Sequence, residues 1–211
     1  MKPDDGVSRI LQDEFGVSRE TLQELEDYAA LLVKWNAKIN LVSPATLPEL
    51  WTRHILDSAQ LFHLLPGEVQ SIGDIGSGGG LPGLILAILA KTKAPKIRVT
   101  MIESDRRKCA FLQTVSGQLG LGARILPDRI ESAAPLQTDV LSARALAPLP
   151  KLMGYAARHL APKGHALLMK GANVETEIEE ALASWTFDLQ KHPSQTQAEA
   201  CILEVFNIRP R

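Results

Sequence analysis

Residues 71–83 read SIGDIGSGGGLPG, and five glycines fall between Gly76 and Gly83. The first five residues predict a short strand, the glycines predict a tight turn, and Pro82 with the apolar run after it predicts a helix. Glycine adopts backbone angles that side chains forbid, and it lets the main chain approach a ligand closely. A turn that leads into a helix N-terminus also directs free N–H groups at a ligand. The stretch therefore predicts a nucleotide-type pocket.

Two loop patterns fit this turn. The dinucleotide fingerprint G-x-G-x-x-G can be placed on Gly78, Gly80 and Gly83, with an acidic partner expected about 20 residues later. The spacing from Asp74 through Gly76, Gly78 and Gly80 resembles motif I of the S-adenosylmethionine-dependent methyltransferases, in which Asp74 would orient the loop and face the ammonium side of the cofactor. A glycine turn without a ligand is the third alternative, which the entropy lost in ordering five glycines disfavours.

Composition limits the classes of protein that fit. The chain has 211 residues, 45% of them hydrophobic and 22% charged, which is typical of one large globular unit and not of a disordered chain. The formal net charge is −1, so a nucleic acid would have to be bound by a local basic patch. Cys109 and Cys201 match no metal-ligand spacing, and we expect reduced thiols and no metal. Neither a signal peptide nor a membrane-length apolar run is evident, so we expect a cytoplasmic protein without a membrane partner.

The pattern of apolar residues changes at residue 71. Before it, Leu22, Leu25, Ala29 and Leu32 recur at helical spacing, and a capping-box pattern at 46–49 predicts a second long helix that ends before residue 66. After it, strands and helices alternate, which predicts a parallel α/β sheet. We expect a helical extension over 1–68, packed on a core formed by one compact unit over 69–211. The expected strands are 71–75, 97–103, 123–126, 140–143, 165–169, 187–192 and 202–208, and the expected helices between them are 82–91, 106–119, 149–160 and 174–183.

Seven strands, with two close together at the C-terminal end, fit the seven-stranded Rossmann-like fold of class I S-adenosylmethionine-dependent methyltransferases better than a six-stranded dinucleotide fold. Ligands of open α/β sheets bind at the carboxyl ends of strands. Glu103 ends the second strand and could accept hydrogen bonds from both ribose hydroxyls. The turn at 128–132, with Ile130 and Glu131, would border an adenine, and Arg144 after the fourth strand should point into the site.

The absence of two sequence motifs reduces the number of methylation reactions that fit this chain. Amino-group methylation of bases commonly uses an N-P-P-Y-like turn after the fourth strand, where this chain has Ala143-Arg144-Ala145-Leu146. Methylation of pyrimidine carbon 5 needs a cysteine near that turn, and Cys109 lies instead in the helix after the second strand. A reaction without a general base fits this pattern. Guanine N7 carries a free lone pair, and positioning alone can be a large catalytic effect.

Together these residues resemble a known family. They are similar to the bacterial small-subunit ribosomal RNA methyltransferase G family, also called glucose-inhibited division protein B. The matching segments are 35–36, 40–43, 53–58, 74–83, 102–104, 107–108, 111–112, 142–145 and 170–171. The resemblance implies methylation of guanine N7 in the decoding-region loop of 16S ribosomal RNA, with S-adenosylmethionine as cofactor and 16S RNA or the small subunit as partner. It implies cofactor contacts at Gly76, Leu81, Ile130, Glu131 and Arg144, and the fold adds Asp74, Gly78 and Glu103.

We expect catalytic contributions from Arg144, Asp57 and His54, because the motif 53–58 is predicted to lie over the pocket. We expect RNA contacts from Lys34, Asn40, Arg53, Arg106, Arg107, Lys108 and Lys170, and we expect a monomer. Two alternatives stay open at this point. One is a nicotinamide-dependent oxidoreductase, and the other is a module that binds S-adenosylmethionine or RNA without chemistry.

Overall fold

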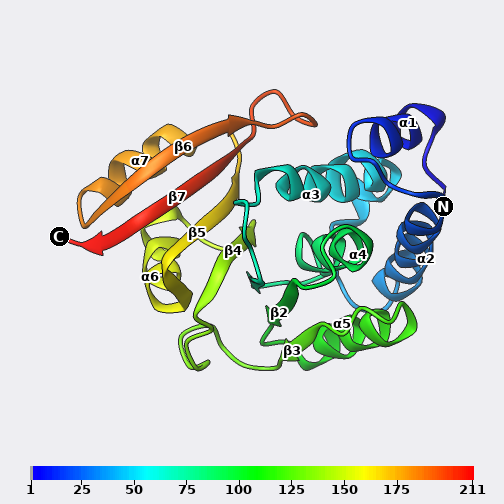
Figure 1. Cartoon of the computed structure of the whole chain (residues 1–211), viewed down its shortest axis with the longest axis horizontal. Helices are drawn as coiled ribbons and strands as arrows, with labels where there is room; N and C mark the ends of the chain where they lie inside the picture. The colour runs from blue at the N-terminus through cyan, green and yellow to red at the C-terminus, as the bar shows by residue number, and fades with distance from the viewer. Residues whose placement is uncertain (1) are drawn as a thin grey trace.

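A computed structural model describes residues 2–211 of the chain. Its seven strands form one sheet in the order β3-β2-β1-β4-β5-β7-β6 (Figure 1). Strand β7 runs antiparallel to both of its neighbours, whereas the β1–β2, β1–β4, β2–β3 and β4–β5 pairs are parallel. The strands are β1 (Ser71–Ile75), β2 (Arg98–Ile102), β3 (Arg124–Leu126), β4 (Thr138–Arg144), β5 (Leu160–Lys170), β6 (Trp185–Pro193) and β7 (Cys201–Pro210).

Helices cover the two faces of this sheet. The N-terminal helices gather with α4 and α5 at one end of the molecule, while α6 and α7 lie beside β5, β6 and β7 at the other (Figure 1). The α-helices are α1 (Asp5–Asp13), α2 (Arg19–Asn36), α3 (Asp57–Ala59), α4 (Gly83–Lys93), α5 (Arg106–Gln118), α6 (Leu149–His159) and α7 (Val174–Leu182).

The hydrophobic core lies on both faces of the sheet. One cluster joins Leu25 and Leu32 of α2 to Ile85 of α4 and to Leu167 of β5. The other joins α6 and β7 to Leu168, the next residue of β5. Side chains of successive strand residues point to opposite faces, so β5 contributes to both clusters. The central strands of the sheet are thus buried on both sides, and the carboxyl ends of the parallel strands lie at one fixed edge.

The predicted seven-stranded α/β architecture is confirmed, with differences at the ends of elements. The first strand matches its predicted bounds, whereas β4 and β5 are longer than predicted. We expected the helix that begins at Leu149 to include Leu160, but α6 ends at His159 and Leu160 pairs with Thr138 of β4. Pro162 lies in this added length of strand, next to a register shift between Thr138 and Val140. The tertiary pairing overrides the apolar helical pattern there.

The segment before the sheet is less regular than predicted. In place of one helix, the chain forms the 3₁₀-helix η1 (Pro44–Glu49), a π-helical segment η2 (Trp51–Leu56), the single turn α3, and the 3₁₀-helix η3 (Gln60–Leu64). Pro48 lacks an N–H donor, which interrupts a regular α-helix at this point. The Thr46 hydroxyl donates to the Ser43 carbonyl and lies 2.8 Å from His54 Nε2, and no capping box forms among the described residues. Single π-helical turns often occur at functional sites, and this one carries His54.

Tyr28 connects the N-terminal helices to the glycine-rich turn. Its side chain is fully buried, and its hydroxyl donates a hydrogen bond of 2.8 Å to the carbonyl oxygen of Gly79. Gly79 also packs against Leu41, the residue whose backbone N–H donates to Asn36 Oδ1. The conformation of the turn therefore depends on α2 and on the segment that follows it.

We predict that Tyr28→Phe lowers the free energy of unfolding by about 1–2 kcal/mol, because the buried Gly79 carbonyl loses its donor while the ring is retained. Thr114→Val is the matched control, since it removes an exposed hydroxyl that bonds only to Ala110 within its own helix; we expect a change within about 0.5 kcal/mol. Denaturant unfolding of both variants measures the difference. Equal effects would show that the Tyr28–Gly79 bond does not stabilise the turn.

Candidate functional site

The glycine turn lies at the carboxyl edge of the sheet, between β1 and β2. Gly76, Gly78 and Gly80 adopt positive φ angles of 67°, 54° and 81°, which favour glycine. The N–H groups of Gly76 and Ser77 both donate to the carbonyl of Ile102 at the end of β2. These bonds fix the turn to the neighbouring strand.

Glu103 holds the same turn through its side chain. Oε2 accepts a hydrogen bond of 2.8 Å from Gly78 N, and Oε1 accepts one of 2.8 Å from Asp105 N. The residue is only 8% exposed, so its carboxylate is both anchored and desolvated. Backbone donors therefore aim the predicted ribose-binding group at the space above the turn.

A cavity of about 360 Å³ opens at this point. Its size lies within the range of about 300–1,000 Å³ of small-ligand sites. A methyl group added at Gly78 would meet no atom closer than 3.8 Å, so the turn leaves room for a ligand to approach its backbone. A carboxylate for hydroxyl groups, an apolar Ile130 and a close glycine backbone together fit a nucleoside. The lining includes Gly76, Gly78, Glu103, Ile130, Glu131 and Tyr155, and we call it the glycine-loop cavity.

Three predicted cofactor residues, Asp74, Leu81 and Arg144, do not line this cavity. Asp74 is 1% exposed; its Oδ1 accepts a hydrogen bond from Ser142 Oγ, and its Oδ2 lies next to Gly83, at the start of α4. Burial raises the pKa of Asp74 to about 6. Leu81 is 5% exposed and belongs to the core cluster of the N-terminal helices. Asp74 and Leu81 support the turn from the side that faces the protein interior, because both side chains are buried there.

Arg144 points elsewhere than we predicted. It does not line the glycine-loop cavity; its guanidinium donates to the Arg53 carbonyl (3.1 Å) and to His54 Nδ1 (2.8 Å). Nη1 also lies 3.6 Å from Asp57 Oδ2. The three predicted catalytic residues are thus brought together, although they come from segments about 90 positions apart. Arg144 and Arg53 line a second cavity of about 280 Å³, the polar cavity, whose lining also includes His54, Asp57, Met169 and Ser194.

The hydrogen bonds around His54 define its tautomer. Arginine can only donate, so Nδ1 of His54 must accept, and Nε2–H then donates to the Thr46 hydroxyl. Burial, with the nearby charge of Arg144, lowers the pKa of His54 to about 4. The imidazole is therefore neutral at physiological pH. Both ring nitrogens are occupied, so His54 positions Arg144 and has no free nitrogen to accept a proton.

Asp57 connects the N-terminal segment to the C-terminal hairpin. Its Oδ1 accepts hydrogen bonds from Gln60 Nε2 (2.8 Å) and Thr196 Oγ1 (2.6 Å), with Ser194 Oγ at 3.4 Å. The backbone N–H of Gln195 donates to Gln60 Oε1. Sequence reasoning missed the contribution of the β6–β7 loop, residues 194–200, because its polar residues carry no local signal. Gln60 was detectable only as a polar neighbour of Asp57 one turn along a helix.

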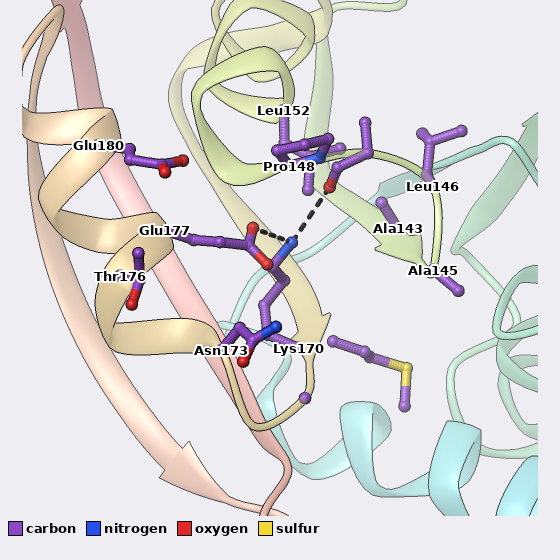
Figure 2. A pocket seen from close by; sticks show the side chains of 13 residues that line it. Ala143, Ala145, Leu146, Pro148, Leu152, Lys170, Asn173, Thr176, Glu177 and Glu180 are labelled. Carbon is purple, nitrogen blue, oxygen red and sulfur yellow. Dashed lines mark hydrogen bonds and ion pairs between the residues drawn. The ribbon is translucent and has the colours of Figure 1, made fainter.

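A third cavity, of about 760 Å³, lies between the end of β5, the segment after β4, and α7 (Figure 2). Lys170 spans it: the ammonium group forms an ion pair of 2.5 Å with Glu177 and donates to the carbonyl of Ala147. Its side chain is 9% exposed. This placement corrects our expectation that Lys170 belongs with the RNA-facing residues, because its charge is already paired inside the protein.

The other predicted RNA-contacting residues lie on the surface. Lys34 and Asn40 are exposed at and after the end of α2, and Arg53 is half-exposed beside the polar cavity. The basic residues of α5 lie at the start of that helix, where Asp105 caps the N-terminus through hydrogen bonds to two backbone N–H groups. Arg106 and Arg107 are exposed there, whereas Lys108 lines the glycine-loop cavity.

Among residues 2–211, no group of three or more His, Cys, Asp or Glu side chains is arranged to hold a metal ion. No helix in the described part of the chain has both the length and the apolar character needed to cross a membrane.

Comparison with solved structures identifies the fold. An O-methyltransferase from Bacillus cereus, solved in complex with SAH, superposes with a TM-score of 0.58 at 14% identity, covering 96% of this chain and 97% of that one. A SAM-dependent methyltransferase from Aquifex aeolicus gives a TM-score of 0.55 at 15% identity, covering 84% and 96%. At these identities the likeness shows the fold, that of the class I S-adenosylmethionine-dependent methyltransferases.

Comparison with known sequences identifies the family. The family model described as rRNA small subunit methyltransferase G matches residues 21–202. Ribosomal RNA small subunit methyltransferase G of Ruegeria sp. (strain TM1040) is 50% identical over 192 residues, covering 91% of this chain and 93% of the relative. The protein of the same name from Acidiphilium cryptum is 50% identical over 195 residues, covering 92% and 88%. The chain therefore belongs to the ribosomal RNA small subunit methyltransferase G family, a family of S-adenosylmethionine-dependent methyltransferases.

Proposed function

We propose that this protein transfers a methyl group from S-adenosylmethionine to N7 of a guanine in the decoding-region loop of 16S ribosomal RNA. One observation supports N7 in particular: the imidazole in the polar cavity has both nitrogens engaged, so it cannot take a proton from an acceptor. N7 of guanine has a free lone pair and loses no proton when it is methylated. We further propose that the protein acts as a monomer in the cytoplasm, on naked RNA or on the small subunit.

The glycine-loop cavity is our proposed cofactor site. The cofactor supplies a methyl group on a positively charged sulfur. Glu103 would accept hydrogen bonds from the ribose hydroxyls, and Ile130 would pack on the adenine with Glu131 at its edge. The Glu131 carboxylate is oriented by a hydrogen bond from the Tyr155 hydroxyl. Gly78 would allow close approach of the amino-acid part, and Gly76, whose Cβ position is filled by Leu146, would contact it through the backbone.

Arg144 is our proposed link between the cofactor and the acceptor. Ala145, the next residue, lines both the glycine-loop cavity and the polar cavity, so the two cavities lie on either side of it. The guanidinium is held on three sides by Arg53, His54 and Asp57, and its side chain is 18% exposed. A fixed cation at this junction suits the carboxylate of the cofactor, and its rigidity would orient the two reactants.

The surface basic groups would hold the RNA backbone. Lys34, Arg53, Arg106 and Arg107 are exposed and can contact phosphates. The formal net charge of −1 indicates that shape and base contacts contribute more than bulk charge. A folded RNA with an accessible loop is the substrate class that fits.

Small subunits from cells that lack this protein provide the direct test. We expect incubation with the purified protein and labelled S-adenosylmethionine to produce a single 7-methylguanosine, identified by mass spectrometry of the digested 16S RNA. A different methylated nucleoside would contradict the N7 proposal. Cofactor binding by calorimetry without any label in RNA would contradict the proposed substrate and retain the proposed cofactor site.

We predict that Gly78→Ala weakens S-adenosylmethionine binding by about tenfold or more, because the new methyl group enters the cavity and strains the bond to Glu103. Gly120→Ala is the matched control, since Gly120 has a similar φ of 58° and equally open space, but lies in the turn after α5. Each change should lower stability by about 1–2 kcal/mol through the positive φ. Isothermal calorimetry compares the affinities, and equal losses in both variants would argue against the proposed cofactor site.

We predict that His54 contributes no inflection to the methylation rate at saturating substrate between about pH 6.5 and pH 8. The folded-state pKa of His54 is about 4, so this residue stays neutral over the whole window. A single-turnover pH profile measures this dependence. A rate that rises with an inflection near 6.5, and loses that inflection in His54→Gln, would show that His54 acts as a base.

A further inference from the structure

The polar cavity has the size and surroundings of a site for a single base. Its volume of about 280 Å³ is just below the range of about 300–1,000 Å³ typical of whole drug-sized ligands. Met169 and Ile202 line it with apolar surface, and Asp57 and Arg144 line it with charge. Through Ala145 it adjoins the glycine-loop cavity, so a base bound here would lie next to the proposed methyl donor.

The two carboxylate oxygens of Asp57 have different surroundings. Oδ1 is saturated by Gln60 and Thr196, which fix the plane of the carboxylate. Among residues 2–211, Oδ2 receives no hydrogen bond within 3.5 Å, and its closest charged neighbour is Arg144 Nη1 at 3.6 Å. The residue is 7% exposed and lines the cavity. A ligand that enters therefore meets an acceptor oxygen that is positioned and incompletely bonded.

Guanine matches such an acceptor. Its Watson–Crick edge carries two donors side by side, N1–H and N2–H, while N7 lies on the opposite edge of the ring system. Adenine presents an acceptor at N1, so a carboxylate at that position would repel it. A base held by its Watson–Crick edge thus exposes N7. RNA-modifying enzymes bind unstacked bases in this manner, through the Watson–Crick edge and apolar surfaces.

We propose that the polar cavity is the target-guanine site and that Asp57 is the residue that selects guanine, accepting hydrogen bonds from N1–H and N2–H. This inference rests on the proposed function and adds the position and the recognition of its substrate. The β6–β7 loop forms one wall of the site, and Thr196 and Ser194 set the orientation of the carboxylate. This gives the C-terminal hairpin a direct part in substrate recognition.

The same contact favours the transition state. The N7 lone pair forms the new N–C bond while the C–S bond breaks and its electrons remain on sulfur, so positive charge passes to the purine and no proton leaves. A cationic purine has a more acidic N1–H, and its hydrogen bond to a buried carboxylate becomes stronger as the reaction proceeds. Interactions that strengthen in the transition state raise the rate of the chemical step.

Replacing the target guanosine by inosine tests the recognition without changing the protein. Inosine lacks the N2 amino group and keeps N1–H and N7. We expect small subunits reconstituted with ligated 16S RNA that carries inosine at the target position to be methylated with about tenfold to a hundredfold lower kcat/KM. Equal rates for guanosine and inosine in the wild-type protein would overturn the proposal, and this readout does not depend on the folding of any variant.

The variant Asp57→Asn and the replacement of guanosine by inosine together form a double-mutant cycle, which measures the coupling between Asp57 and the base. We expect the kcat of the variant on guanosine to fall by about a hundredfold, its S-adenosylmethionine affinity to stay within about twofold, and its guanosine-to-inosine ratio to approach one. Thr196→Val, which keeps the carboxylate and removes one anchor, should reduce the ratio by a smaller factor. Glu68→Gln is the matched control. Glu68 is exposed and precedes the N-terminal end of β1, away from the carboxyl edge of the sheet, so this variant should behave like the wild type.

The outcomes separate this inference from the proposed function. If the wild-type protein forms no 7-methylguanosine, the proposed function fails. 7-Methylguanosine could instead form while Asp57→Asn lowers the methylation rates of guanosine and inosine by the same factor. Asp57 would then only support the fold around Arg144, and the proposal that it selects guanine would be wrong.

Discussion

A largely shielded cation at the end of the fourth strand organises this edge of the molecule. The side chain of Arg144 is only 18% exposed, so its charge is partly desolvated and is stabilised by pairing and hydrogen bonding. Its partners come from the segment before the sheet: a backbone carbonyl, a neutral imidazole and a carboxylate. The carboxylate is in turn bonded to the loop that joins the last two strands. The start, the middle and the end of the chain therefore depend on one charged group.

The irregular helical segment follows from this requirement. A continuous α-helix would distribute residues 53–57 around its axis at 100° intervals, and a π-helical turn changes that spacing locally. In the observed conformation His54 and Asp57 each face Arg144, with no hydrogen bond to each other. The π-helical segment is thus consistent with a stretch of chain shaped by a tertiary contact.

Local sequence is sufficient where the structure is locally determined. The strand at 71–75, the glycine turn and the helix after it follow from alternation, positive-φ glycines and an N-terminal proline, and the seven-stranded sheet follows from their repetition. The direction of the Arg144 side chain does not follow from local sequence, because a residue at a strand end can turn toward either of two neighbouring cavities. Lys170 illustrates the same limit: an isolated lysine after a strand suggests a surface charge, and only the packing of α7 shows its partner, Glu177. The β6–β7 loop has no local pattern, and its bonds to Asp57 and Gln60 join residues about 135 positions apart.

Two carboxylates have different tasks at this edge of the sheet. Glu103 is fixed by backbone donors on the side of the sheet where the cofactor is proposed to bind, and Asp57 is fixed by side-chain donors where the acceptor is proposed to bind. Arg144 lies between them, and its positive charge alone would repel a purine that becomes positive. Asp57, at 3.6 Å, balances that charge. Because Arg144 is paired with Asp57, the side where the cofactor is proposed to bind suits a negative group. The side where the guanine is proposed to bind suits a developing positive charge. The arrangement of charge, rather than the transfer of a proton, is then what this edge of the sheet contributes to the chemistry.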